Sequence, residues 1–169
     1  MLPIVLTRYR SNDHEPPQDD IVNRTRWGAQ PPRSVAPLEN VNTIFYTRTD
    51  TSCTTFGQCQ VLMKQMQKVD LNSSNLTDLR YNFLIGGDGT VYEGRGFYAR
   101  NEIDNSSLLV ALMHDFTDDP SNPICAGFQK VLLEGFRLDK LQPALVDVSC
   151  YQCQDETFNQ HIESNCLEW

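Results

Sequence analysis

The pattern of apolar and polar positions predicts strands at two places in the middle of the chain. Ser107–Met113 reads SLLVALM, a near-continuous apolar run that is typical of a central strand covered on both faces. Val41–Thr47 alternates instead, with Ile44 and Tyr46 on one face and Phe45 on the other. We therefore expect a sheet with a buried middle strand and a neighbour that has two different faces.

A glycine-rich hairpin is predicted within Tyr81–Phe97, which reads YNFLIGGDGTVYEGRGF. Two short apolar runs, Tyr81–Ile85 and Thr90–Tyr92, flank the tetrapeptide Gly86–Gly89. Three glycines in that turn allow positive φ, as a tight hairpin requires. The Lys-Ser/Thr pair of a phosphate-binding loop does not follow, so the glycines predict a turn and no nucleotide site.

Within the hairpin, Asp88 and Glu93 are two carboxylates that could be taken for an acid–base pair. We expect Asp88 to be a turn residue and Glu93 to be a strand-end partner of Arg95. The remaining elements follow from helical spacing and from short apolar runs. They are a helix over Gln58–Val69 with Leu62, Met63, Met66 and Val69 on its apolar face, a helix from Ser121 or Asn122 to Gly135, an edge strand over Ala144–Val148, a weaker helix over Thr157–Asn165, and an extended segment around a buried Trp27.

Helices before and after a set of short strands indicate one α/β sheet layered by helices, within a single domain over residues 21–169. Residues 1–20 are expected to be an N-terminal extension. It divides into a possible edge strand, Leu2–Tyr9, and an acidic linker, Ser11–Asp20. Because Met1–Leu6 is too short for a signal-peptide core, we expect an export signal or membrane anchor upstream of this sequence.

Charge and composition limit which classes of partner the protein can bind and indicate the compartment in which it folds. The formal net charge of −8 argues against binding to nucleic acid, and no apolar run is long enough for a membrane span. Six cysteines indicate an oxidising, extracellular compartment with up to three disulfides. Sequons point the same way, and the candidate glycosylation sites are Asn23, Asn72, Asn75 and Asn105.

Metal chemistry is disfavoured by the residues themselves. His14, His114 and His161 lie far apart in the sequence and show no ligand spacing. The pair Cys150 and Cys153, together with His161 and Cys166, offers four possible zinc ligands, but the spacing is loose and disulfides are favoured. We predict no cofactor and no metal.

Three stretches together resemble the peptidoglycan recognition protein family, which is related to zinc-dependent N-acetylmuramoyl-L-alanine amidases. They are RTRWGAQPP at Arg24–Pro32, the spacing of Cys53 and Cys59, and the hairpin at Tyr81–Phe97. The resemblance covers roughly Val22 to Cys166. It implies a central mixed sheet flanked by about three helices, as in the type 2 zinc amidases, with a groove for a muropeptide stem. It also implies a disulfide between Cys53 and Cys59, while Cys125, Cys150, Cys153 and Cys166 leave three possible pairings.

The same resemblance marks a degenerate amidase site. Catalytic members of the family hold zinc through two histidines and one cysteine, with a tyrosine close to the metal. The positions that match the three zinc ligands are Phe45, Leu145 and Cys153. The tyrosine is kept, as Tyr81. A catalytic zinc needs three protein ligands, and neither Phe nor Leu has a lone pair to offer. The resemblance therefore implies a non-enzyme.

The groove also departs from the family pattern. Leu76 replaces a tryptophan, Arg80 replaces a glycine and could extend into the groove, and the loop Tyr98–Ser106 is short. The expected function is that of a non-catalytic, membrane-anchored ectodomain of the insect receptor or regulator type in innate immunity. It would bind another peptidoglycan recognition protein ectodomain as a decoy, with weak or absent peptidoglycan binding. The alternatives are a receptor with a remodelled groove, an amidase, and a structural spacer.

Overall fold

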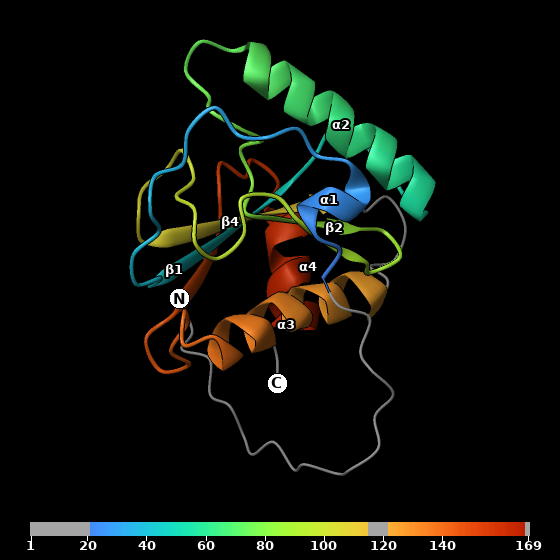
Figure 1. The fold of residues 1–169 in the computed structure, drawn as a ribbon. Coiled ribbons are helices and arrows are strands. Elements are labelled where there is room, and N and C mark those ends of the chain that lie inside the picture. The colour runs from blue at the N-terminus through green and yellow to red at the C-terminus, as the bar shows by residue number, and fades with distance from the viewer. Residues whose placement is uncertain (1–20, 115–121, 168–169) are drawn as a thin grey trace, which may run out of the picture.

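The computed structural model describes residues 21–114 and 122–167, and it contains a five-stranded mixed sheet with helices on both faces (Figure 1). The predicted strand Leu2–Tyr9, the predicted linker Ser11–Asp20, and His14 lie outside the described residues. The strands are β1 Thr43–Arg48, β2 Phe83–Gly86, β3 Val91–Glu93, β4 Ser107–Met113 and β5 Asp147–Cys150. The helices are α1 Arg24–Trp27, α2 Phe56–Asn72, α3 Asn122–Arg137 and α4 Glu156–Cys166.

Strand β4 lies in the middle of the sheet, whose order is β3-β2-β4-β1-β5. All seven of its residues are buried, which confirms the prediction for Ser107–Met113. Strands β2, β1 and β5 run parallel to their neighbours in the centre, and only β3 is antiparallel, through the hairpin. The predicted α/β fold with a mixed sheet is confirmed.

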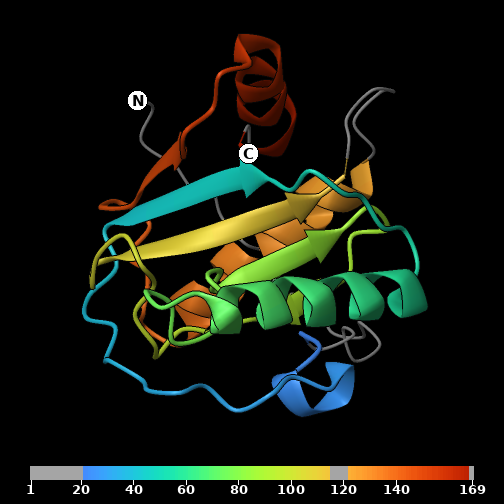
Figure 2. The same cartoon turned by 90° about the horizontal axis from the view of Figure 1, so that it is seen from above.

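The two faces of the sheet carry separate cores. Helices α3 and α4 cover one face, and α2 covers part of the other (Figures 1 and 2). Ile44 and Tyr46 share one face of β1, as predicted, and that face packs toward α3 and α4. The Tyr46 ring meets Phe128 of α3 and Phe158 of α4 edge to face, and its hydroxyl bonds to Asn159 of α4. Tyr46 therefore fastens β1 to both helices.

The turn of the hairpin uses its glycines in two ways. Only Gly89 of the tetrapeptide has a positive φ, 84°. A Cβ on Gly86 would lie 2.9 Å from Cys59 Sγ, and one on Gly87 would lie 3.0 Å from the carbonyl oxygen of Cys53. These two glycines are therefore required by close packing, and not by positive φ as predicted. The Asp88 carboxylate accepts a bond from the amide of Thr90, which confirms its role in the turn.

Three predicted elements are wrong in detail. Arg24–Trp27 was expected to be extended, but it forms one helical turn because Asn23 caps its start and Gly28 ends it with a φ of 81°. Helix α3 runs through Gly135 to Arg137, since a Cβ on Gly135 would lie 2.4 Å from Leu141 and the glycine serves packing. Strand β5 begins at Asp147, three residues later than predicted, and its four residues pair with β1.

The predicted apolar face of α2 is confirmed for Met63, which is buried, and for Leu62 and Met66, which pack against the core on that side of the sheet. Val69 is 67% exposed, whereas Gln67 and Asp70 are buried. The Gln67 side chain bonds to Gln30 and Asp78, and Asp70 binds Arg80. Polar partners from other segments thus bury Gln67 and Asp70 beside the predicted apolar face, and only Val69 of that face stays exposed.

Glycine at position 127 of α3 is expected to be essential for helix packing. A Cβ there would lie 2.6 Å from the carbonyl oxygen of Gly89 and 2.7 Å from Ile85 Cγ2. We expect Gly127→Ala to lower the free energy of unfolding by about 1–3 kcal/mol, although alanine favours helices. Gly57→Ala in α2 is the matched control, because no atom lies within 4 Å of its Cβ, and it should stabilise by about 0.5–1 kcal/mol. Urea denaturation measures both, and effects of the same sign would contradict the packing argument.

Candidate functional site

The face of the sheet that carries α2 is only partly covered. The core on that side takes residues from β2, β3 and β4, but none from β1 or β5. Figure 2 looks onto this face, with α2 over β2 and with β1 to the side of the helix. Four half-buried side chains from β1, β5 and the residue after β5 occupy this uncovered region, which we call the open face. They are Phe45, Thr47, Ser149 and Tyr151.

Phe45 is the centre of the open face. It lies between Leu109 of β4 and Ser149 of β5 in the sheet register. Its ring contacts the Tyr151 ring, with centroids 5.7 Å apart. Two residues beyond Tyr151, Cys153 is joined by a disulfide to Cys150 at the end of β5. An aromatic pair and a disulfide therefore occupy the region where the resemblance implies a metal.

The other two positions of the degenerate site differ in their surroundings. Tyr81 is half-buried and packs against the α2-side core. Burial raises the pKa of its hydroxyl, and the cation of Arg80 opposes that shift. Tyr81 therefore stays a protonated phenol at neutral pH. Leu145 is 65% exposed in the turn before β5 and takes no part in the pairing with β1.

These residues do not fit a zinc ion. Phe45 and Leu145 have no donor atom for a metal. The sulfur of Cys153 is bonded to Cys150, so it is not the thiolate that would bind zinc. Within residues 21–114 and 122–167, no group of three His, Cys, Asp or Glu side chains is placed to hold a metal. No step of metal-assisted hydrolysis can be assigned to these side chains.

The Arg80 side chain, which the sequence suggested could extend into the groove, is bound to α2. Its guanidinium binds Asp70 of α2, with 2.7 Å between Nη2 and Oδ1, and its backbone amide donates to the same carboxylate. The hydrogen bond to Asp70 raises the pKa of Arg80 above its ordinary value. The replacement of glycine by arginine therefore fastens the end of α2 to the segment before β2.

The short loop Tyr98–Ser106 is held by buried amides. Asn101 donates to the side chain of Asn82 and to the carbonyl of Ser107, at 3.0 and 2.7 Å. Asn82 in turn donates to the carbonyls of Gly96 and Ala99. Arg95 binds Glu102 in this loop, so the predicted Glu93–Arg95 pair is wrong. No apolar pattern in the sequence predicts this network of buried amides.

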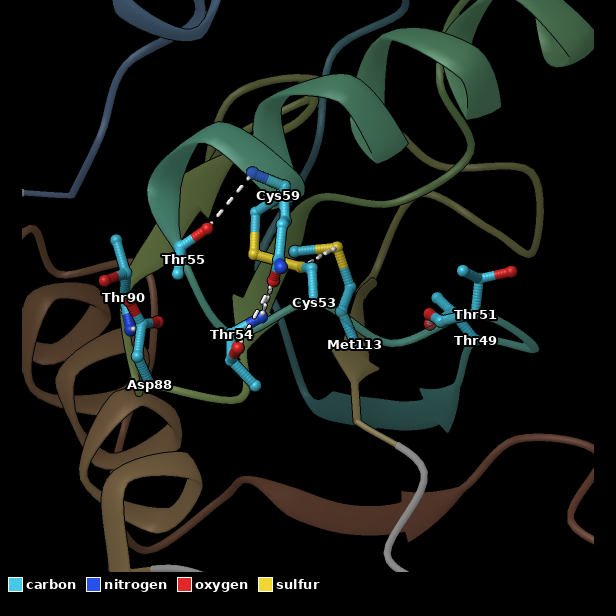
Figure 3. Close-up of a disulfide and its surroundings, with 10 residues drawn as sticks. Thr49, Thr51, Cys53, Thr54, Thr55, Cys59, Asp88, Thr90 and Met113 are labelled. Atoms are coloured by element: carbon cyan, nitrogen blue, oxygen red, sulfur yellow. Dashed lines mark hydrogen bonds between the residues drawn. A yellow bond between two sulfur atoms is a disulfide. The ribbon is translucent and has the colours of Figure 1, made fainter.

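The cysteines and sequons are distributed as follows. Cys53 and Cys59, the pair that the resemblance implies, form a disulfide where α2 begins, and the sulfur of Met113 lies 3.9 Å from that of Cys53 (Figure 3). The other two disulfides are Cys125–Cys166 and Cys150–Cys153, one of the three arrangements left open. The candidate glycosylation sites are exposed at Asn23, Asn72 and Asn75 and half-buried at Asn105.

A cavity of about 600 Å³ lies away from the open face. It is lined by the hairpin turn, the start of α2 and one side of α3, including Phe56, Lys130 and Leu133. None of the four positions of the degenerate site belongs to its lining. The cavity therefore adds no chemistry to that site.

The mixed sheet with helices on both faces and its open face define an α/β domain whose described residues hold no metal-ligand group, and comparisons with known proteins identify its family. No protein-family model matches the chain. It is 37% identical over 133 residues to peptidoglycan-recognition protein LC of Drosophila melanogaster, across 73% of this chain and 26% of that protein. The ectodomain of the Drosophila transmembrane receptor PGRP-LCa is 34% identical, with a TM-score of 0.70 over 76% of this chain and 83% of that ectodomain. The chain belongs to the peptidoglycan-recognition protein family.

A third relative shows the likeness of fold alone. It is the complex of the PGRP-LCa and PGRP-LCx ectodomains with tracheal cytotoxin, with 24% identity, a TM-score of 0.75, and 84% of this chain and 93% of that chain covered. The matched part of the chain spans about a quarter of the length of peptidoglycan-recognition protein LC, at 26%. Among the described residues, no helix combines the length and apolar character that a membrane crossing requires.

Proposed function

We propose that this chain is a non-catalytic ectodomain that regulates innate immune signalling by binding another peptidoglycan-recognition ectodomain. One observation carries the absence of catalysis: the side chains at the three positions that the resemblance matches to zinc ligands offer no set of donors for the metal. Phe45 and Leu145 lack donor atoms, and the sulfur of Cys153 is bonded to Cys150. Without the metal, no water is activated for amide hydrolysis. We therefore infer that the chain is not an amidase.

We further propose that muropeptide binding is weak or absent. The aromatic pair Phe45–Tyr151 fills part of the open face, and Arg80 is engaged by Asp70 instead of facing a ligand. A polar ligand would have to bury its hydrogen-bonding groups against these rings, which costs free energy unless each group finds a partner. The receptor reading keeps one argument in its favour, since the protonated Tyr81 phenol can still donate a hydrogen bond.

The proposed partner is a sister ectodomain. The PGRP-LCa and PGRP-LCx ectodomains assemble together with tracheal cytotoxin, which is a precedent for pairing within the family. We place this chain outside the cell, as a membrane-anchored glycoprotein, because three disulfides and four sequons suit an oxidising compartment. As a decoy, it would occupy a receptor surface without contributing a ligand.

Calorimetry distinguishes these functions. We expect the purified chain to bind a sister ectodomain without muropeptide, and to give no binding heat with tracheal cytotoxin alone. A muropeptide-binding family member, titrated in parallel, controls for the activity of the ligand. Saturable heat with tracheal cytotoxin alone would favour the receptor, and failure to bind any sister ectodomain would favour the spacer. Stoichiometric zinc in the purified chain, together with release of stem peptides, would support the amidase alternative.

A further inference from the structure

The disulfide Cys150–Cys153 differs from the other two in its surroundings. Both of its cysteines are half-buried, at the end of β5 and beside the open face. The cysteines of the other two bonds are all buried, at 3% and 0% exposure for Cys53 and Cys59 and at 7% and 1% for Cys125 and Cys166. A dissolved thiol can therefore approach the Cys150–Cys153 bond more easily than the others.

Two further features concern the loop that this bond closes. It closes a loop with only two residues between its cysteines, whereas Cys125–Cys166 spans 41 positions. Closing a small loop removes little entropy from the unfolded chain. Folding and this bond therefore stabilise each other only slightly. Within the loop, Gln152 has a φ of 55°, a left-handed conformation that is strained for a residue with a side chain.

We propose that Cys150–Cys153 is a site of thiol–disulfide exchange that extracellular dithiols open while the other two disulfides stay closed. A thiolate of the reductant attacks one sulfur, and the other sulfur leaves as a thiolate. The second thiol of the reductant then resolves the mixed disulfide. Two electrons and two protons reach the protein, which gains two thiols, and the reductant becomes a disulfide.

Opening the bond affects only the segment around Gln152. The amide of Tyr151 still donates to the carbonyl of Tyr46 at 2.9 Å, so β5 stays paired with β1. Helix α4 remains attached through Cys125–Cys166 and through its buried Phe158 and Ile162. The freed thiols lie next to the Phe45–Tyr151 pair, and the exchange thus acts on the open face. This inference does not depend on the proposed partner.

Differential alkylation of the full chain tests the proposal. The protein is equilibrated in buffers of reduced and oxidised dithiothreitol, its thiols are trapped with iodoacetamide, and the labelled peptides are measured by mass spectrometry. We expect Cys150 and Cys153 to be half labelled at a reduced-to-oxidised ratio on the order of tenfold lower than the other four cysteines. The far-UV circular dichroism should stay unchanged over that range.

The variant Cys150→Ser/Cys153→Ser is the control. It should show no labelling at the low ratios and a native circular dichroism spectrum. Labelling of Cys53, Cys59, Cys125 or Cys166 in the same range as Cys150 and Cys153 would overturn selectivity. Loss of the circular dichroism signal when only Cys150 and Cys153 are reduced would overturn local opening.

Discussion

Replacing Asp78 with alanine is expected to lower the free energy of unfolding by about 3–5 kcal/mol, because the substitution removes the buried carboxylate of an ion pair and the acceptor of two buried donors. The carboxylate is 5% exposed and 2.7 Å from Nη1 of Arg24. It also accepts bonds from the Gln67 side chain and from the backbone amide of Leu79, at 2.9 and 2.7 Å. The substitution would leave these donors without an acceptor in a region closed to water, which is costly.

The effect should be large because Asp78 joins distant parts of the chain. Arg24 comes from α1, Gln67 from α2, and Arg24 also donates to the carbonyl of Gly94 beyond the hairpin. Asp78→Asn keeps the volume and one acceptor oxygen while it removes the charge, so we expect an intermediate loss. Urea denaturation followed by circular dichroism measures each variant.

Glu134→Gln is the matched control for a surface pair. Glu134 binds Arg137 three residues away on α3, and both side chains reach solvent, at 32% and 68% exposure. Such pairs contribute about 0.5 kcal/mol or less. A cost for Asp78→Ala no larger than that of Glu134→Gln would refute the claim that the buried carboxylate organises these segments.

Strands whose burial follows from their own apolar residues could be predicted from the sequence. The run Ser107–Met113 is buried on both faces, and its bounds coincide with β4. Strand β1 keeps its alternation because Ile44 and Tyr46 pack toward α3 and α4 while Phe45 faces the other side. In these elements, the local pattern and the tertiary environment agree.

Elements decided by distant polar partners could not be predicted. Gln67 and Asp70 look like exposed positions of an amphipathic helix, but partners brought in by other segments bury them. One turn of helix at Arg24–Trp27 has too few residues to show a period, and its caps, Asn23 and Gly28, were the available signal. The boundary of β5 depends on its single neighbour, β1, and therefore on register instead of local pattern.

The candidate site divides in the same way. The loss of donor atoms at Phe45 and Leu145 is a property of side-chain chemistry and is visible in the sequence. The contact between the Tyr151 and Phe45 rings and the pairing of Cys150 with Cys153 depend on the course of the chain after β5. The spacing of these two cysteines was a signal for that pairing, but it was equally compatible with the alternatives.

Removing the disulfide between α3 and α4 is expected to cost about 4 kcal/mol of unfolding free energy, because Cys125–Cys166 closes a long loop in the unfolded chain. Cys53→Ala/Cys59→Ala is the matched control: both cysteine pairs are buried, but its sequence separation is 6 instead of 41, which predicts about 2 kcal/mol. Urea denaturation of Cys125→Ala/Cys166→Ala and of the control gives the difference. An equal or larger loss in the control would mean that native packing, and not loop length, sets the stability of α4.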